Sequence, residues 1–170
     1  MIQSYYGNGK GKTTAAVGCA IRSLGSGQRV LFVQLLKNNE SSEFRILKNL
    51  DNLDVLKPDE RYELFDNLKK ERTELLSEAY NKLLFEELTK NNECYQMIIL
   101  DEIFDIIEFE YVSEDKLLEL LNLLKEHSEI ILTGHILPDK IALVSDYISE
   151  IREINHPYKK GVPSRKGIEY

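Results

Sequence analysis

Alternating glycines followed by Gly-Lys-Thr lie close to the start of the chain, where residues 7–14 read Gly-Asn-Gly-Lys-Gly-Lys-Thr-Thr. Glycines let the backbone curl until successive N–H groups point inward, which makes a nest for an anion at the start of a helix. Lys12 would bring a positive charge to a polyphosphate, and the hydroxyl of Thr13 is placed to bind the accompanying Mg²⁺. The sequence therefore predicts a phosphate-binding loop. Its candidate ligand-binding residues are Gly7, Asn8, Gly9, Lys10, Gly11, Lys12, Thr13 and Thr14.

This loop is one residue shorter than the standard phosphate-binding pattern. The standard pattern has four residues between its first glycine and the Gly-Lys pair, whereas only residues 8–10 separate Gly7 from Gly11. A Gly-rich turn that merely joins a strand to a helix is the alternative interpretation. The apolar residues before the loop and the helical pattern after it favour phosphate binding. The shorter spacing suggests that the phosphates are held differently from those in an ordinary ATPase.

Two adjacent acids, Asp101 and Glu102, follow an apolar run at residues 97–100. Such a run is typical of a buried strand, which here would deliver carboxylates to the edge of a sheet. In phosphate-binding-loop proteins an acid at this place binds Mg²⁺ directly or through water. The sequence does not decide which of the two acids faces the metal. Asp105 and Glu108 lie further along and are weaker candidates.

Polar residues at the ends of two other apolar runs extend the candidate site. Residues 29–36 predict a strand that is covered on both faces, and Gln34 and Lys37 mark its carboxyl end. Open α/β sheets bind their ligands at that edge, so both side chains are candidate substrate contacts. The alternative interpretation of Lys37 is a lysine on the protein surface. His135 follows another predicted strand and is a candidate phosphate contact, or else a packing or surface residue.

Alternating strand and helix patterns must position these side chains. Strands that are unbroken apolar runs, separated by helices, predict an α/β three-layer sandwich with a mainly parallel sheet. Ser113 is a predicted N-cap, and Pro138 is expected to start a short helix. The predicted strands cover residues 1–6, 29–36, 53–56, 95–102, 130–135 and 146–154. The predicted helices cover 13–22, 64–88 and 114–126, with a short one at 42–50.

Length and composition limit the classes of protein to consider. The 170 residues are expected to form one domain, and a net charge of −7 argues against a nucleic-acid partner. Positive charge collects in the turn-rich tail at residues 156–167, which fits a solvated loop or a role at a ligand pocket or subunit contact. No apolar run reaches the ~18 residues of a membrane span. Because the first predicted strand begins at Met1, we expect no signal peptide. The two cysteines lack the spacing of metal ligands, which fits a reducing compartment. We therefore expect a cytoplasmic protein.

With the loop and the acidic pair placed, the chain resembles the corrinoid adenosyltransferases of the cob(I)alamin/cob(I)yrinic acid a,c-diamide type. The resemblance spans nearly the whole chain, and the shortened loop is itself the form found in that family. It implies a P-loop NTPase (RecA-like) fold. The segments that carry the resemblance are residues 7–16, 33–37, 100–103, 132–134, 145–151, 156–157, 160–162 and 167–170.

The resemblance implies that the 5'-deoxyadenosyl group of ATP is transferred to the cobalt of a reduced corrinoid, with triphosphate as the leaving group. In this family ATP lies reversed in the loop, so that C5' rather than the γ-phosphate is exposed. Cob(I) is a very strong nucleophile, so no general base is needed. The resemblance implies that Lys12 and Thr13 act in catalysis, together with Mg²⁺, and it favours Glu102 over Asp101 as the acid on the metal side.

The family also displaces the lower axial ligand of cobalt with apolar and aromatic side chains. The corresponding segment here is residues 61–66, where Tyr62 and Phe65 are the candidates for this role; packing at the start of a helix is the alternative. His135 stands where the family commonly has arginine. The resemblance further implies an electron-donating reductase as a partner and a homodimer.

Two other functions compete with this interpretation. A small P-loop ATPase or kinase would need a residue that positions water near the γ-phosphate, and none can be identified in the sequence. A regulatory module that binds a nucleotide or a corrinoid without turnover remains the non-enzymatic alternative, because residues 61–66 match the family's aromatic segment poorly.

Overall fold

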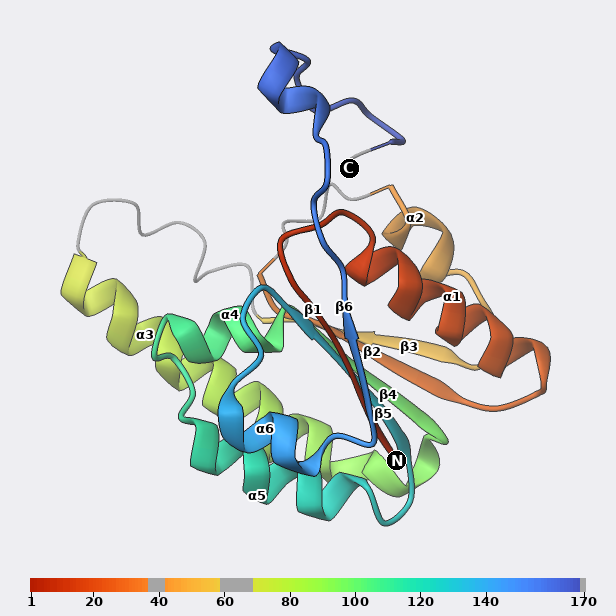
Figure 1. Cartoon of the computed structure of the whole chain (residues 1–170). Helices are drawn as coiled ribbons and strands as arrows, with labels where there is room; N and C mark the ends of the chain where they lie inside the picture. Colours follow the sequence, from red (N-terminus) through yellow and green to blue (C-terminus); the bar gives the residue numbers. More distant parts are fainter. Residues whose placement is uncertain (37–41, 59–68, 169–170) are drawn as a thin grey trace.

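A parallel six-stranded sheet organises the chain (Figure 1). The computed structural model describes residues 1–36, 42–58 and 69–168. The strand order is β3-β2-β4-β5-β1-β6, and every neighbouring pair is parallel, as the sequence predicted. The strands are β1 (Ile2–Tyr6), β2 (Val30–Gln34), β3 (Leu53–Leu56), β4 (Met97–Asp101), β5 (Glu129–Gly134) and β6 (Tyr147–Glu150).

Helices cover both faces of this sheet, and each face has its own apolar core (Figure 1). On one face Ala16 and Ala20 of the first helix pack with Phe32 of β2, since small side chains let the helix approach the sheet closely. On the other face Leu117 and Leu132 belong to the larger core. The predicted three-layer sandwich is therefore confirmed. The first face carries α1 (Lys12–Gly25) and α2 (Phe44–Leu47), and the second carries α3 (Lys69–Lys82), α4 (Ile103–Glu108), α5 (Glu114–Leu124) and α6 (Asp139–Val144).

Helix α5 shows how local sequence sets an element. The hydroxyl oxygen of Ser113 accepts a hydrogen bond from the backbone N–H of Lys116 at 3.3 Å, which caps the helix as predicted. Its buried leucines recur at the spacing that places them on one side of a helix, and that side packs on the sheet. They are Leu117, Leu120, Leu121 and Leu124.

The long helix predicted over residues 64–88 is described from Lys69 onward. It runs as α3, continues in a π-helical turn (η2, Leu83–Glu87) and ends in a 3-10 segment (η3, Leu88–Cys94). Tyr80 and Leu84 are buried in the larger core, as their place in the predicted apolar stripe requires. None of the described helices is long and apolar enough to cross a membrane.

Strand β6 is shorter than the predicted strand at residues 146–154. It ends at Glu150, and the chain then leaves the sheet to cross the phosphate-binding loop. There the carbonyl oxygen of Ile151 accepts a hydrogen bond from the N–H of Gly9 at 2.8 Å, and the N–H of Glu153 donates to the side chain of Asn8 at 3.0 Å. The prediction is wrong for the end of this strand, because hydrogen bonds to the loop replace those that a longer strand would make.

Candidate active site

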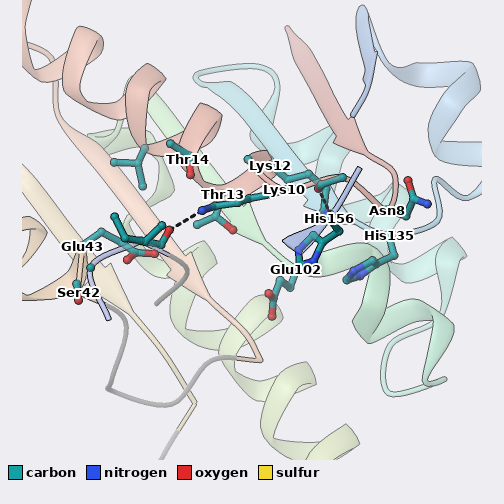
Figure 2. Close-up of a pocket in the computed structure, with 15 residues that line it drawn as sticks. Asn8, Lys10, Lys12, Thr13, Thr14, Ser42, Glu43, Glu102, His135 and His156 are labelled. Carbon is teal, nitrogen blue, oxygen red and sulfur yellow. Dashed lines mark hydrogen bonds between the residues drawn. The ribbon is translucent and has the colours of Figure 1, made fainter. Parts of the chain in front are cut away.

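A pocket of about 610 Å³ lies over the phosphate-binding loop at the carboxyl edge of the sheet (Figure 2). The loop and the first turn of α1 form one wall. Segments from four other places in the chain, including the tail, complete it. The lining residues are Asn8, Gly9, Lys10, Gly11, Lys12, Thr13, Thr14, Val17, Ser42, Glu43, Glu102, His135, His156, Gly167 and Ile168.

The first two glycines of the loop tie it to the rest of the fold. The N–H of Gly7 donates to the carbonyl oxygen of His135 at 3.0 Å, and the N–H of Gly9 donates to that of Ile151 at 2.8 Å. In this conformation both donors are engaged by backbone carbonyls. Gly7 and Gly9 therefore shape the loop, and the later N–H groups at the start of α1 are the ones placed toward an anion.

The segment at residues 151–153, which crosses the loop, explains why positions 7 and 9 are glycine. A Cβ on Gly7 would overlap the carbonyl oxygen of Ile151, and a Cβ on Gly9 would lie 2.8 Å from that oxygen. Gly7 also has φ near +113°, where a side chain is strained. Gly11 has a similar φ of +119°, but no atom lies within 4 Å of a Cβ placed there. Close approach of the crossing segment is thus a requirement at Gly7 and Gly9 only.

We expect Gly7→Ala to lower the free energy of unfolding by about 2–4 kcal/mol, because it adds steric overlap to an unfavourable φ. Gly11→Ala is the matched control and should cost about 1–2 kcal/mol, since only φ is unfavourable there. Urea unfolding followed by circular dichroism measures both. Equal losses in the two variants would show that contact with Ile151 does not constrain Gly7.

Two lysines of the loop point in different directions (Figure 2). Lys12 Nζ donates to the carbonyl oxygens of Gly7 and Gly9, at 2.7 and 3.1 Å, and so lies within the curl of the loop. Lys10 Nζ donates at 2.7 Å to the carbonyl oxygen of Ile168 in the tail. Lys12 is therefore the lysine placed to contact a bound phosphate, and Lys10 holds the tail against the pocket.

Asp101 is a fully buried acid behind the loop. Its Oδ1 accepts a hydrogen bond from the Thr133 hydroxyl at 2.8 Å, and its Oδ2 accepts one from the Thr13 hydroxyl at 3.4 Å. Because Thr13 donates its proton to Asp101, the lone pairs of its oxygen are turned away from the acid and suit a cation.

Glu102 is the acid of the pair that lines the pocket. It has φ near +65°, a left-handed conformation that is costly for a residue with a side chain, and its N–H donates to the Thr133 hydroxyl at 2.8 Å. Mg²⁺ prefers hard oxygen ligands and needs only one or two carboxylates beside phosphates and water. Thr13 and Glu102 offer such oxygens to the pocket and fit this ion, whereas both oxygens of the buried Asp101 accept hydrogen bonds from threonine hydroxyls. Within the described ranges no group of three or more His, Cys, Asp or Glu forms a denser metal site.

His135 is held at the rim of the pocket by a buried carboxylate. Its Nδ1 lies 2.6 Å from Oδ1 of Asp105, and its backbone N–H donates to Oδ2 of the same residue at 3.3 Å. Gly134 lets helix α4 approach this closely, because a Cβ there would overlap the side chain of Phe104. Asp105, a weak metal candidate by sequence, instead orients a histidine that lines the pocket.

Gln34, another predicted contact, is not among the residues that line the pocket. Gln34 pairs in register with Asp101 on the neighbouring strand and is 2% exposed, and its Nε2 has no hydrogen-bond partner in the described part of the chain. Lys37, Tyr62 and Phe65 lie outside the described residues.

Comparison with known proteins identifies the family. A model of the family described as ATP:corrinoid adenosyltransferase BtuR/CobO/CobP matches residues 1–170. This chain belongs to that family. The corrinoid adenosyltransferase CobA of Salmonella typhimurium is 28% identical over 172 residues, a match that covers 100% of this chain and 85% of that protein. The corrinoid adenosyltransferase of Escherichia coli K12 is 26% identical over 170 residues, with the same coverage.

A solved structure with a similar fold is the cytoplasmic domain of EssC. It matches with a TM-score of 0.56 and 16% identity, covering 97% of this chain and 33% of that one. At this level of identity the similarity shows the fold alone. The predicted α/β fold class is confirmed.

Several pocket residues were not among the sequence candidates. Val17 lies in α1, and Ser42 and Glu43 come from the segment before α2. The others, His156, Gly167 and Ile168, come from the tail. For the tail, the alternative of a role at a ligand pocket is the one that the structure supports. The signal for it was present in the sequence, because His156 and Gly167-Ile168 lie in segments that carry the family resemblance.

Proposed function

We propose that this protein transfers the 5'-deoxyadenosyl group of ATP to the cobalt of a reduced corrinoid. The observation that carries the proposal is the match of the whole chain to the ATP:corrinoid adenosyltransferase family. The pocket supports it, because Lys12, Thr13 and Glu102 line one cavity as a triphosphate site requires.

In the proposed step an electron pair of cob(I) attacks C5' of ATP and forms the cobalt–carbon bond. The C5'–O bond breaks, and its electron pair leaves with triphosphate, while cobalt is formally oxidised to the +3 state. No proton moves, so the site needs no general base. The tasks left to the protein are to position C5' and to stabilise the negative charge that develops on triphosphate.

The described residues suit those tasks. Lys12 and the N–H groups at the start of α1 would hold the triphosphate, with ATP reversed in the loop. Thr13 and Glu102 would hold Mg²⁺, and Asp101 would orient the Thr13 hydroxyl. The ion would neutralise part of the charge on the leaving group. Lys37 would lie near the substrates, and Tyr62 or Phe65 would face the lower side of cobalt.

The wider setting follows from the same proposal. Corrinoid must be reduced to cob(I) before transfer, so an electron-donating reductase would supply the electron. We further propose that residues 1–170 act as one domain, in a cytoplasmic homodimer, on small-molecule substrates.

A direct assay combines the protein with ATP, Mg²⁺ and a chemically reduced corrinoid. We expect the absorption spectrum of an alkylcobalt product that is destroyed by light, since the cobalt–carbon bond is photolabile. Release of orthophosphate without that spectrum would instead favour an ATPase or kinase. Tight binding of ATP with no product of either kind would favour a regulatory module. Both of the latter outcomes contradict the proposal.

A further inference from the structure

The tail after β6 is fastened to the phosphate-binding loop at both of its ends. At the near end the Gly9 N–H donates to the carbonyl oxygen of Ile151, and Asn8 Oδ1 accepts the Glu153 N–H at 3.0 Å. At the far end Lys10 Nζ donates to the carbonyl oxygen of Ile168 at 2.7 Å. Between these attachments the tail places His156 in the lining of the pocket, on the side that faces Glu102 (Figure 2).

The hydrogen bonding of His156 determines where its proton lies. Nδ1 accepts a hydrogen bond from the backbone N–H of Tyr158 at 3.1 Å. A ring nitrogen that accepts a hydrogen bond carries no proton, so the proton of the neutral ring is on Nε2. His156 therefore offers a hydrogen-bond donor at the far side of its ring.

The chemistry of the pocket indicates what this donor meets. Lys12 and the start of α1 make the floor suitable for an anion, and a polyphosphate lying on it has oxygen acceptors on its other sides. An Nε2–H group can donate to such an oxygen but cannot accept from a donor. His156 thus has the polarity of a phosphate contact from the part of the lining that the tail supplies.

We propose that His156 is a triphosphate-binding residue, which donates from Nε2 to the polyphosphate of ATP and of the leaving group. The proposal deepens the proposed function and rests on it for the identity of the ligand. The tail thereby becomes part of the nucleotide site. Asn8, Gly9 and Lys10 of the loop hold the tail in place, and His156 of the tail contacts the phosphates that the loop binds.

The competing role for His156 is structural. Its side chain caps the 3-10 turn η4 (Pro157–Lys160) by accepting the N–H of Tyr158. Two substitutions separate the roles. Asn reproduces the acceptor at the position of Nδ1 and is a good N-cap, but it does not reach the pocket. Gln has a longer side chain, which carries an N–H donor near the position of Nε2.

The test is calorimetric titration of the full chain with inorganic triphosphate and with ATP, both in Mg²⁺. We expect His156→Asn to weaken both ligands about tenfold or more, as for loss of a hydrogen bond to a charged group, and His156→Gln to retain most of the affinity. His127→Ala is the control, because His127 follows α5 and is not among the lining residues. It should bind like the unaltered protein.

Each other outcome overturns the inference. Full affinity in His156→Asn would show a capping role alone, and equal weakening in both variants with a lowered melting temperature would show a structural role. The binding assay uses no corrinoid, so it is independent of adenosyl transfer. If the unaltered protein makes alkylcobalt and both His156 variants bind triphosphate and ATP normally, only this inference is contradicted. Unaltered protein that binds neither ligand would contradict the inference and the proposed function together.

Discussion

Replacing Lys12 with alanine is expected to lower kcat/KM for ATP by about a hundred- to a thousandfold. Charge develops on triphosphate as the C5'–O bond breaks, and removal of one donor aimed at such charge costs roughly this much in other enzymes. Lys12 Nζ donates hydrogen bonds to the carbonyl oxygens of Gly7 and Gly9, inside the curl of the loop. Its charge is therefore close to any phosphate that the loop binds. Arginine should not restore activity, because its planar guanidinium does not replace a compact ammonium.

The rate of alkylcobalt formation at several ATP concentrations measures this effect. Lys125→Ala is the matched control, since that exposed lysine follows α5, donates to Asn122 at 2.7 Å and is not among the residues that line the pocket. It should keep normal kinetics. Circular dichroism should show that Lys12→Ala remains folded. Near-normal turnover in a folded Lys12→Ala variant would mean that the loop is not the triphosphate site.

Glu102→Gln should lower kcat about a hundredfold and raise the Mg²⁺ concentration needed for half-maximal activity. The substitution keeps the size of the side chain but removes the negative charge that faces the pocket, and Mg²⁺ binds carboxylate far better than amide oxygen. Asp101 is fully buried and already accepts hydrogen bonds from two threonine hydroxyls, so it is not placed to compensate.

Titration of activity with Mg²⁺ gives the half-saturating concentration for each variant. Glu108→Gln serves as the control, because Glu108 lies at the other end of the short helix α4 and is exposed. Its Mg²⁺ dependence should be unchanged. If Glu102→Gln shared the Mg²⁺ dependence and turnover of the unaltered protein, Glu102 would not be the acid on the metal side.

Much of the fold could be predicted because its signals are local. The unbroken apolar runs at residues 30–33 and 97–100 indicate strands that are buried on both faces, and they form two neighbouring interior strands of the sheet, β2 and β4. Ser113 caps α5 as its residue type predicts. The end of β6 could not be predicted this way, because residues 151–154 look like a strand. Their hydrogen bonds go to Asn8 and Gly9, more than a hundred residues away in sequence.

The same distinction between local and long-range signals applies to the candidate site. The loop residues and the Asp101-Glu102 pair were predictable, because short motifs at the ends of strands carry them. The pairing of Asp105 with His135 depends on how closely α4 approaches β5, which Gly134 permits. A sequence shows each of these residues but not the distance between them. For the same reason it does not show the proton position of His156, which follows from one backbone hydrogen bond.

The phosphorus product of turnover tests the central claim most directly. Phosphorus-31 NMR of a reaction containing ATP, Mg²⁺, reduced corrinoid and catalytic protein distinguishes intact triphosphate from ADP, pyrophosphate and orthophosphate. We predict that triphosphate accumulates in proportion to alkylcobalt, because C5' is the atom attacked and all three phosphates leave together. ADP and orthophosphate as the products, with the corrinoid unchanged, would contradict adenosyl transfer.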